Sequence, residues 1–183
     1  RSSSANEDNL KYSNAGKFKS FLSVNPKNIP DLEIKIKSVI SSFKKDKTKN
    51  DEILIQDMVK NVGISGVATT CDKDTYAPYY HINFSKNKDT SLVTSGKDGS
   101  KSFIFFKYSK MRPSSKYLKK IINLLKELEK KFKYKFIDIE FIIDLRGNLY
   151  LVQVRPLLKK EIKFENFDYS KPLKKLEKKI KKL

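Results

Sequence analysis

The chain has 183 residues, of which 38% are hydrophobic, enough for one domain with a buried core or for two small lobes. It contains no apolar run of membrane-spanning length and no signal-peptide pattern, and its one cysteine, Cys71, excludes an internal disulfide, so we expect a cytoplasmic protein. The net charge of +19 comes almost entirely from Lys, because only four of the 40 basic residues are Arg. Nucleic-acid readers favour Arg and cluster their charge, so a basic nucleic-acid-binding domain is the less favoured alternative.

The first half of the chain predicts one helix and three strands. Residues 1–25 are polar and end in a short apolar run. The helix is predicted over Asp31 to Phe43, where apolar residues recur at helical spacing. The strands are predicted over Ile53–Val59, Ser65–Thr70 and Tyr79–Phe84.

The second half continues with a strand, a helix, a hairpin and a basic tail. The strand is predicted over Ser102–Tyr108 and ends before Pro113, and Ser114 or Ser115 can cap the helix that follows. That helix carries a helical apolar stripe from Leu118 to Phe132. Residues 159–183 read as a basic amphipathic helix or an interdomain linker. The fold class is therefore α+β, with a mainly antiparallel sheet and two or three helices.

The hairpin of residues 136–156 is the most informative part of the sequence. Its two apolar strands are joined by a two-residue turn at Arg146-Gly147, or by a four-residue loop ending at Asn148. Either connection sets Glu140 opposite Gln153 and Asp138 opposite Arg155, because side chains alternate across a strand. Two carboxylates, an amide and a guanidinium would then share one patch. Such a patch suits Mg²⁺ and a polyphosphate, although a solvated polar face of the sheet is the plain alternative.

Other candidate residues carry weaker signals. The small residues of 1–8 and 15–20 could surround an anion or belong to a disordered terminus. Gln56 and Met58, at a strand end, could line an adenine slot or pack in the core. His81, the only His, lies mid-strand without a Gly-rich or acidic setting, which favours a structural role. Cys71 reads as a buried or bystander thiol. The sequence has no P-loop, no GxGxxG before a helix and no Cys/His cluster.

Taken in order, these segments resemble the ATP-binding (ATP-grasp) domain of the phosphoenolpyruvate synthase and pyruvate phosphate dikinase family. The resemblance covers about residues 1–158, as an incomplete domain whose Lys-bearing upstream lobe is missing, so we expect a piece of a longer protein. Its most specific part is the final motif pair. The motifs are Arg1-Ser-Ser with Glu7-Asp8, Ala15-Gly16 with Ser20 and Leu22, Ile55-Gln56-x-Met58-Val59, Ser65-Gly66-Val67, Thr94-Ser95-Gly96, Asp138-Ile-Glu140 and Gln153-Val-Arg155-Pro156.

The resemblance implies a site for ATP and Mg²⁺ between two α+β lobes. Glu140 and Gln153 would bind the metal and phosphate oxygens, with Asp138 supporting the metal. Arg155 and Arg1 would hold the terminal phosphates as the catalytic cations. The remaining implied ATP contacts are Ser20, near the phosphates, and Gln56, Met58 and Val59, around the adenine.

The resemblance also implies the reaction. A His on a swivelling domain of the same polypeptide would take a phosphoryl group from ATP and deliver it to a small acceptor, with release of AMP and phosphate. The family's Gly-rich GxGE segment is replaced here by residues 85–96, a variant that resembles a bacterial branch linked to capsule polysaccharide synthesis. That branch includes L-glutamine kinase, so L-glutamine is the implied acceptor. A non-catalytic ATP-grasp-like binding module is the alternative. No nucleic-acid or membrane partner is expected.

Overall fold

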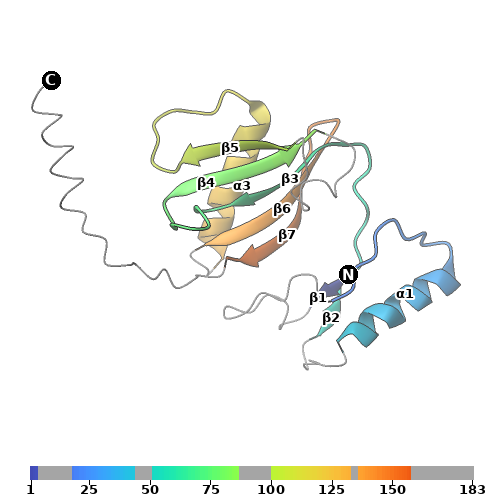
Figure 1. The fold of residues 1–183 in the computed structure, drawn as a ribbon. Coiled ribbons are helices and arrows are strands. Elements are labelled where there is room, and N and C mark those ends of the chain that lie inside the picture. The colour runs from blue at the N-terminus through green and yellow to red at the C-terminus, as the bar shows by residue number, and fades with distance from the viewer. Residues whose placement is uncertain (4–17, 44–50, 87–99, 133–135, 158–183) are drawn as a thin grey trace, which may run out of the picture.

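The computed structural model describes residues 1–3, 18–43, 51–86, 100–132 and 136–157. These residues form two regions (Figure 1). One is a five-stranded sheet covered by a helix, and the other consists of a helix and two very short strands. In chain order the elements are β1 (Ser2–Ser3), α1 (Ile29–Ser42), β2 (Glu52–Ile53), β3 (Val62–Thr69), β4 (Tyr79–Ser85), β5 (Lys101–Phe106), α3 (Lys116–Lys131), β6 (Ile137–Asp144) and β7 (Leu149–Pro156).

The large sheet has the strand order β5-β4-β3-β6-β7, and every neighbouring pair is antiparallel. The longest connection runs from β5 through α3 to β6, which pairs with β3 on the side away from β4. Its placement puts β6 and β7 next to each other at one edge, with the hairpin on the same sheet as β3 and β4. This arrangement confirms the predicted α+β class and the antiparallel sheet.

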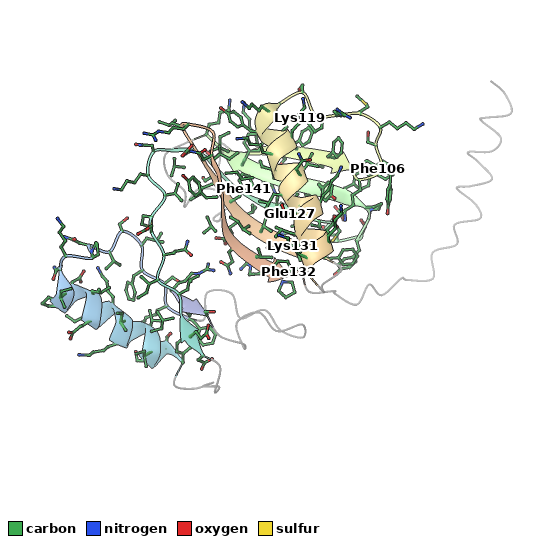
Figure 2. All side chains as sticks on the ribbon, turned by 180° about the vertical axis from the view of Figure 1, so that it is seen from behind. Phe106, Lys119, Glu127, Lys131, Phe132 and Phe141 are labelled. Atoms are coloured by element: carbon green, nitrogen blue, oxygen red, sulfur yellow. The ribbon has the colours of Figure 1, made fainter. Side chains whose placement is uncertain are left out.

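Helix α3 covers one face of that sheet and leaves the other face open among the described residues (Figures 1 and 2). The helix starts where predicted, because the Ser115 side chain accepts a hydrogen bond from the backbone N–H of Leu118 at 3.5 Å. Its apolar stripe packs on alternate residues of the strands, as the period of two requires. The resulting core contains Ile64, Ala68, Tyr80, Ile82, Ile121, Ile122, Leu125, Leu128, Ile137, Ile139, Phe141 and Ile143.

The smaller region is built around α1. The helix begins after Asn28, whose side chain accepts a hydrogen bond from the N–H of Asp31, and Pro30 occupies a position in the first turn that tolerates proline. Within the described ranges its buried core consists of Phe18, Val39 and Phe43. The described part of this region therefore buries less apolar surface than the sheet region does.

Most predicted elements are confirmed within a few residues, but the strand expected over Ile53–Val59 is wrong for most of its length. In the described residues β2 covers only Glu52 and Ile53, which pair with Ser3 and Ser2 of β1. Beyond the backbone hydrogen bond from Leu54 N–H to the carbonyl of Arg1, residues 55–61 form a connection to β3. The predicted basic tail of residues 159–183 lies outside the described residues.

No helix within the described ranges is both long enough and apolar enough to cross a membrane.

Candidate nucleotide and metal site

The site lies on the open face of the sheet, where the β6–β7 hairpin sets two polar pairs side by side. Asp138 pairs with Arg155 and Glu140 pairs with Gln153, as the sequence predicted. Residues 137, 139, 141 and 143 of β6 point into the core, so the intervening Asp138 and Glu140 point away from α3. The hairpin therefore gathers four polar side chains on a face that no described helix covers.

The connection between the two strands differs from the prediction. Ile143 pairs with Leu149, so five residues lie between the last paired positions. The pairing at this end of the hairpin is therefore shifted by one residue from the pairing that a two- or four-residue connection would give. A β-bulge then inserts one extra residue, Val152, between the partners of Phe141 and Glu140. The bulge restores the predicted register at the polar pairs, so the site is as expected although the turn is not.

The turn itself is held by Asp144. Its carboxylate accepts hydrogen bonds from the backbone N–H of Asn148 at 2.8 Å, from the Asn148 amide at 2.9 Å and from the Tyr150 hydroxyl at 3.2 Å. Partial burial acts to raise the pKa of Asp144, but these hydrogen bonds outweigh it, and the pKa lies below its ordinary value. The hairpin thus has a rigid turn on one side of the bulge and the candidate site on the other.

Within the site, Arg155 links the two carboxylates. Its Nη2 donates to Oδ2 of Asp138 at 3.1 Å and lies 3.9 Å from Oε1 of Glu140. Asp138 is only 9% exposed, yet its second oxygen, Oδ1, is buried without a hydrogen-bond partner among the described residues. A buried carboxylate oxygen without a donor is costly, so Oδ1 is a suitable ligand for a cation.

Arg1 reaches the same patch from the other region of the molecule. Its Nη1 donates a 2.7 Å hydrogen bond to Oε1 of Gln153. The backbone carbonyl of Arg1 accepts from Leu54 N–H at 2.8 Å, which fixes β1 to β2 beside the hairpin. The structure therefore brings together five predicted site residues, Arg1, Asp138, Glu140, Gln153 and Arg155.

The other predicted ATP contacts are not gathered with these five. Gln56 and Met58 are exposed and Val59 is half-buried in the connection between β2 and β3. Ser20 is exposed close to α1, where its neighbour Lys19 bonds to the hydroxyls of Ser38 and Ser42. In the described part of the chain, none of the four forms a hydrogen bond to the hairpin. The other small residues of 4–17, and residues 85–96 after Lys86, fall outside the described ranges.

The open face continues from the hairpin onto β3 and β4. Thr69 pairs with both Asp138 and His81, so these three side chains form one row across the sheet. The prediction that His81 lacks an acidic setting is wrong, because its Nε2 lies 3.4 Å from Oδ2 of Asp72. Asp72 belongs to the loop between β3 and β4, and nothing in the sequence pattern of the strand could indicate that contact.

The same loop adds a cation that the sequence prediction missed. Nζ of Lys73 lies 3.9 Å from Oδ2 of Asp138. The pKa of the neighbouring Asp72 carboxyl is lowered, first by the hydrogen bond from the Thr75 hydroxyl. Cys71 is fully buried in this loop, as predicted, and burial raises the pKa of its thiol to about 11.

The donor set suits a magnesium ion that shares its ligands with phosphate. No cluster of three or more His, Cys, Asp or Glu side chains forms a metal cage in the described residues. The hairpin instead offers an amide oxygen and two carboxylates, one of which carries the unpartnered Oδ1 of Asp138. Mg²⁺ typically takes one or two carboxylates and completes its shell with phosphate and water, so the residues present fit it.

Part of the chain is similar to a known protein family. Residues 83–171, just under half of the chain, match the family model described as pyruvate phosphate dikinase, AMP/ATP-binding domain. No curated protein matches the sequence. The match includes β5, α3 and the β6–β7 hairpin with all four of its polar site residues. Residues 83–171 are therefore similar to the AMP/ATP-binding domain of pyruvate phosphate dikinase.

Proposed function

We propose that this chain binds Mg·ATP on the open face of its large sheet, as the nucleotide-binding part of a dikinase-type phosphotransferase with an ATP-grasp fold. The observation that carries the proposal is the convergence of Asp138, Glu140, Gln153 and Arg155, with Arg1 bonded to Gln153. Two carboxylates and two guanidinium groups on one patch match the opposite charges of a metal–polyphosphate complex.

Each side chain has a distinct role in this proposal. Glu140 and Gln153 hold the metal and phosphate oxygens, and Asp138 supports the metal. Arg155 and Arg1 bind the terminal phosphates, where a planar fork can contact two oxygens at once. The bound Mg²⁺ would supply charge neutralisation on the phosphate oxygens.

Asp138 also orients Arg155 before any nucleotide binds. Their 3.1 Å contact holds the guanidinium on the open face, so less side-chain entropy is lost when it meets a phosphate. Catalysis in such a site is mostly positioning and electrostatic stabilisation of the transferred group.

The adenine would lie against Gln56, Met58 and Val59, and Ser20 would approach the phosphates. Met58 is 48% exposed, so a base stacked against it would bury apolar surface that is now in water. These contacts require the connection of residues 54–61 to close on the nucleotide.

The reaction we propose passes through a second domain of the same polypeptide. A His on that swivelling domain takes a phosphoryl group from ATP and transfers it to a small acceptor. With L-glutamine as acceptor, ATP, water and glutamine yield AMP, phosphate and glutamine phosphorylated on its side-chain amide. The resemblance of residues 85–96 to the capsule-polysaccharide branch supports glutamine as that acceptor.

AMP production by the full-length protein tests the nucleotide part of the proposal. Glu140→Gln keeps the shape of the side chain but removes its charge, and we expect AMP formation to fall at least about 100-fold. Arg155→Ala should cause a similar loss. Glu127→Gln, an exposed carboxylate on α3, is the matched control and should retain full activity (Figure 2). Near-normal AMP formation in both site variants would contradict the assignment.

The acceptor needs its own assay, with glutamine, pyruvate and other small acceptors compared at equal concentration. Phosphorylation of glutamine would support the narrower assignment, whereas phosphorylation of pyruvate alone would overturn it and leave the nucleotide site intact. Mg·ATP binding by the full-length protein without any AMP formation would instead favour a non-catalytic binding module.

A further inference from the structure

The loop between β3 and β4, residues 70–78, lies at the end of the open face where β6 begins. It is attached to β6 by Thr70, whose hydroxyl accepts a 2.9 Å hydrogen bond from Ile137 N–H and whose own N–H donates to the Ile137 carbonyl. Farther along, the ring of Tyr76 stacks on Phe136 with centroids 5.5 Å apart. The loop therefore has a fixed position beside Asp138, one residue beyond Ile137.

Asp72 then orients the middle of the loop. Its Oδ1 accepts from the backbone N–H and hydroxyl of Thr75, both at 2.7 Å, and its Oδ2 faces Nε2 of His81 on the open face. Lys73 follows Asp72 in this loop. The side chain of Lys73 extends towards the hairpin.

Lys73 and Arg155 meet at a single carboxylate oxygen. Nζ of Lys73 lies 3.9 Å from Oδ2 of Asp138, and Nη2 of Arg155 lies 3.1 Å from the same atom. The Lys73 contact is too long for a good hydrogen bond, and its side chain is 54% exposed. Lys73 is thus a loosely held cation at the edge of the candidate metal site.

We propose that Lys73 is a further substrate-binding residue, which contacts the terminal phosphate oxygens of Mg·ATP together with Arg155. The inference rests on the proposed function. A cation bound by the Asp138 carboxylate would weaken the attraction between Asp138 and Lys73. The phosphate oxygens would then be the nearest anionic partner for the freed ammonium group.

The alternative is that Lys73 only neutralises Asp138, and the two roles predict different binding data. In both roles Lys73 competes with a metal for Asp138 when no nucleotide is present, so its removal should not weaken binding of the metal alone. Removal of Lys73 should weaken binding of Mg·ATP more than binding of AMP, which lacks the terminal phosphates, only if Lys73 binds phosphate.

Calorimetry on the full-length protein with Mg·ATP, AMP and Mn²⁺ alone tests the proposal. For Lys73→Gln we expect the Kd for Mg·ATP to rise about tenfold, while AMP stays within about twofold and Mn²⁺ binds as well or better. Lys73→Arg should retain most of the Mg·ATP affinity. Lys37→Gln is the matched control, because Lys37 also pairs with a carboxylate, Glu33, but lies on α1.

The inference is overturned if Lys73→Gln binds Mg·ATP within about twofold of the unmodified protein, or if it loses AMP and Mg·ATP equally. Glu140→Gln, measured in parallel, separates this result from failure of the proposed function. If Glu140→Gln loses affinity for Mg·ATP and Lys73→Gln does not, only the role proposed for Lys73 is contradicted. Unchanged binding in both variants overturns the proposed function as well.

Discussion

The two regions of the molecule differ in how firmly they hold their share of the candidate site. Among the described residues, the sheet region buries twelve core residues between the strands and α3, whereas the region around α1 buries three. The four hairpin residues therefore lie on a well-packed sheet, and Arg1 reaches them from a region whose described residues form a smaller core. We infer that packing of the sheet preforms the hairpin part of the site.

Phe141→Ala should give the largest effect, because Phe141 is 1% exposed and lies in the centre of the sheet core (Figure 2). We expect a loss of about 3–5 kcal/mol in the free energy of unfolding, which combines lost transfer energy with the cavity left behind. Urea denaturation followed by circular dichroism measures it.

The matched change in the other region is Phe43→Ala, whose side chain packs against Phe18 with ring centroids 5.4 Å apart. We expect it to raise hydrogen exchange in α1 while exchange in α3 and β6 stays unchanged. Equal loss of protection in both regions would show that they unfold as one unit and would contradict separate cores.

Gly66→Ala should be the next largest change. A Cβ at this position would lie 2.4 Å from the backbone carbonyl oxygen of Asn83 and 2.5 Å from the ring of Phe141. Because a backbone atom cannot move aside as a side chain can, we expect a loss of about 2–3 kcal/mol in unfolding free energy. Gly63→Ala, with its nearest contact at 3.2 Å to a leucine side chain, is the control and should cost clearly less.

Gln153→Ala tests the contact between the regions. It removes the hydrogen bond from Arg1, which joins the two parts at 2.7 Å, and we expect about 1 kcal/mol or more of lost protection in β1 and β2. Hydrogen exchange by mass spectrometry should show no change in α3. Unchanged exchange at β1 and β2 would mean that other contacts hold the regions together.

The smallest predicted effect is the pH dependence set by Asp144. Its folded-state pKa is lowered, so its hydrogen bonds stabilise the fold fully above the unfolded-state pKa of about 4, and this stabilisation is lost as the pH falls through the lower folded-state value. Asp144→Asn should therefore be less stable at neutral pH and lose less stability between about pH 5 and pH 2. Parallel pH profiles for the two proteins would contradict this assignment.

The sequence predicted the sheet better than the connections. Alternation along β6 and β7 indicates which residues share a face, and the core then enforces that register even though a bulge at Val152 and a five-residue connection replace the simple turn. The Ser115 cap and the stripe of α3 were equally readable, because both depend on local spacing.

Contacts between residues that are distant in the sequence were not predictable. The residues after Ile53 are apolar enough for a strand, but strand formation needs a paired neighbour, which the local pattern does not reveal. The acidic neighbour of His81 comes from a loop, and so does Lys73 beside Asp138. Such contacts follow from the path of residues 70–78 and leave no periodic signal in the sequence.

The most direct test of the central claim is calorimetric titration of the full-length protein with Mg·ATP, comparing Glu140→Gln with Glu127→Gln. Both variants remove one carboxylate charge, the first on the open face of the sheet and the second on the exposed side of α3. We predict that Glu140→Gln loses at least about 30-fold in affinity, roughly 2 kcal/mol, while Glu127→Gln binds normally. Equal affinity in the two variants would contradict a nucleotide and metal site at the hairpin.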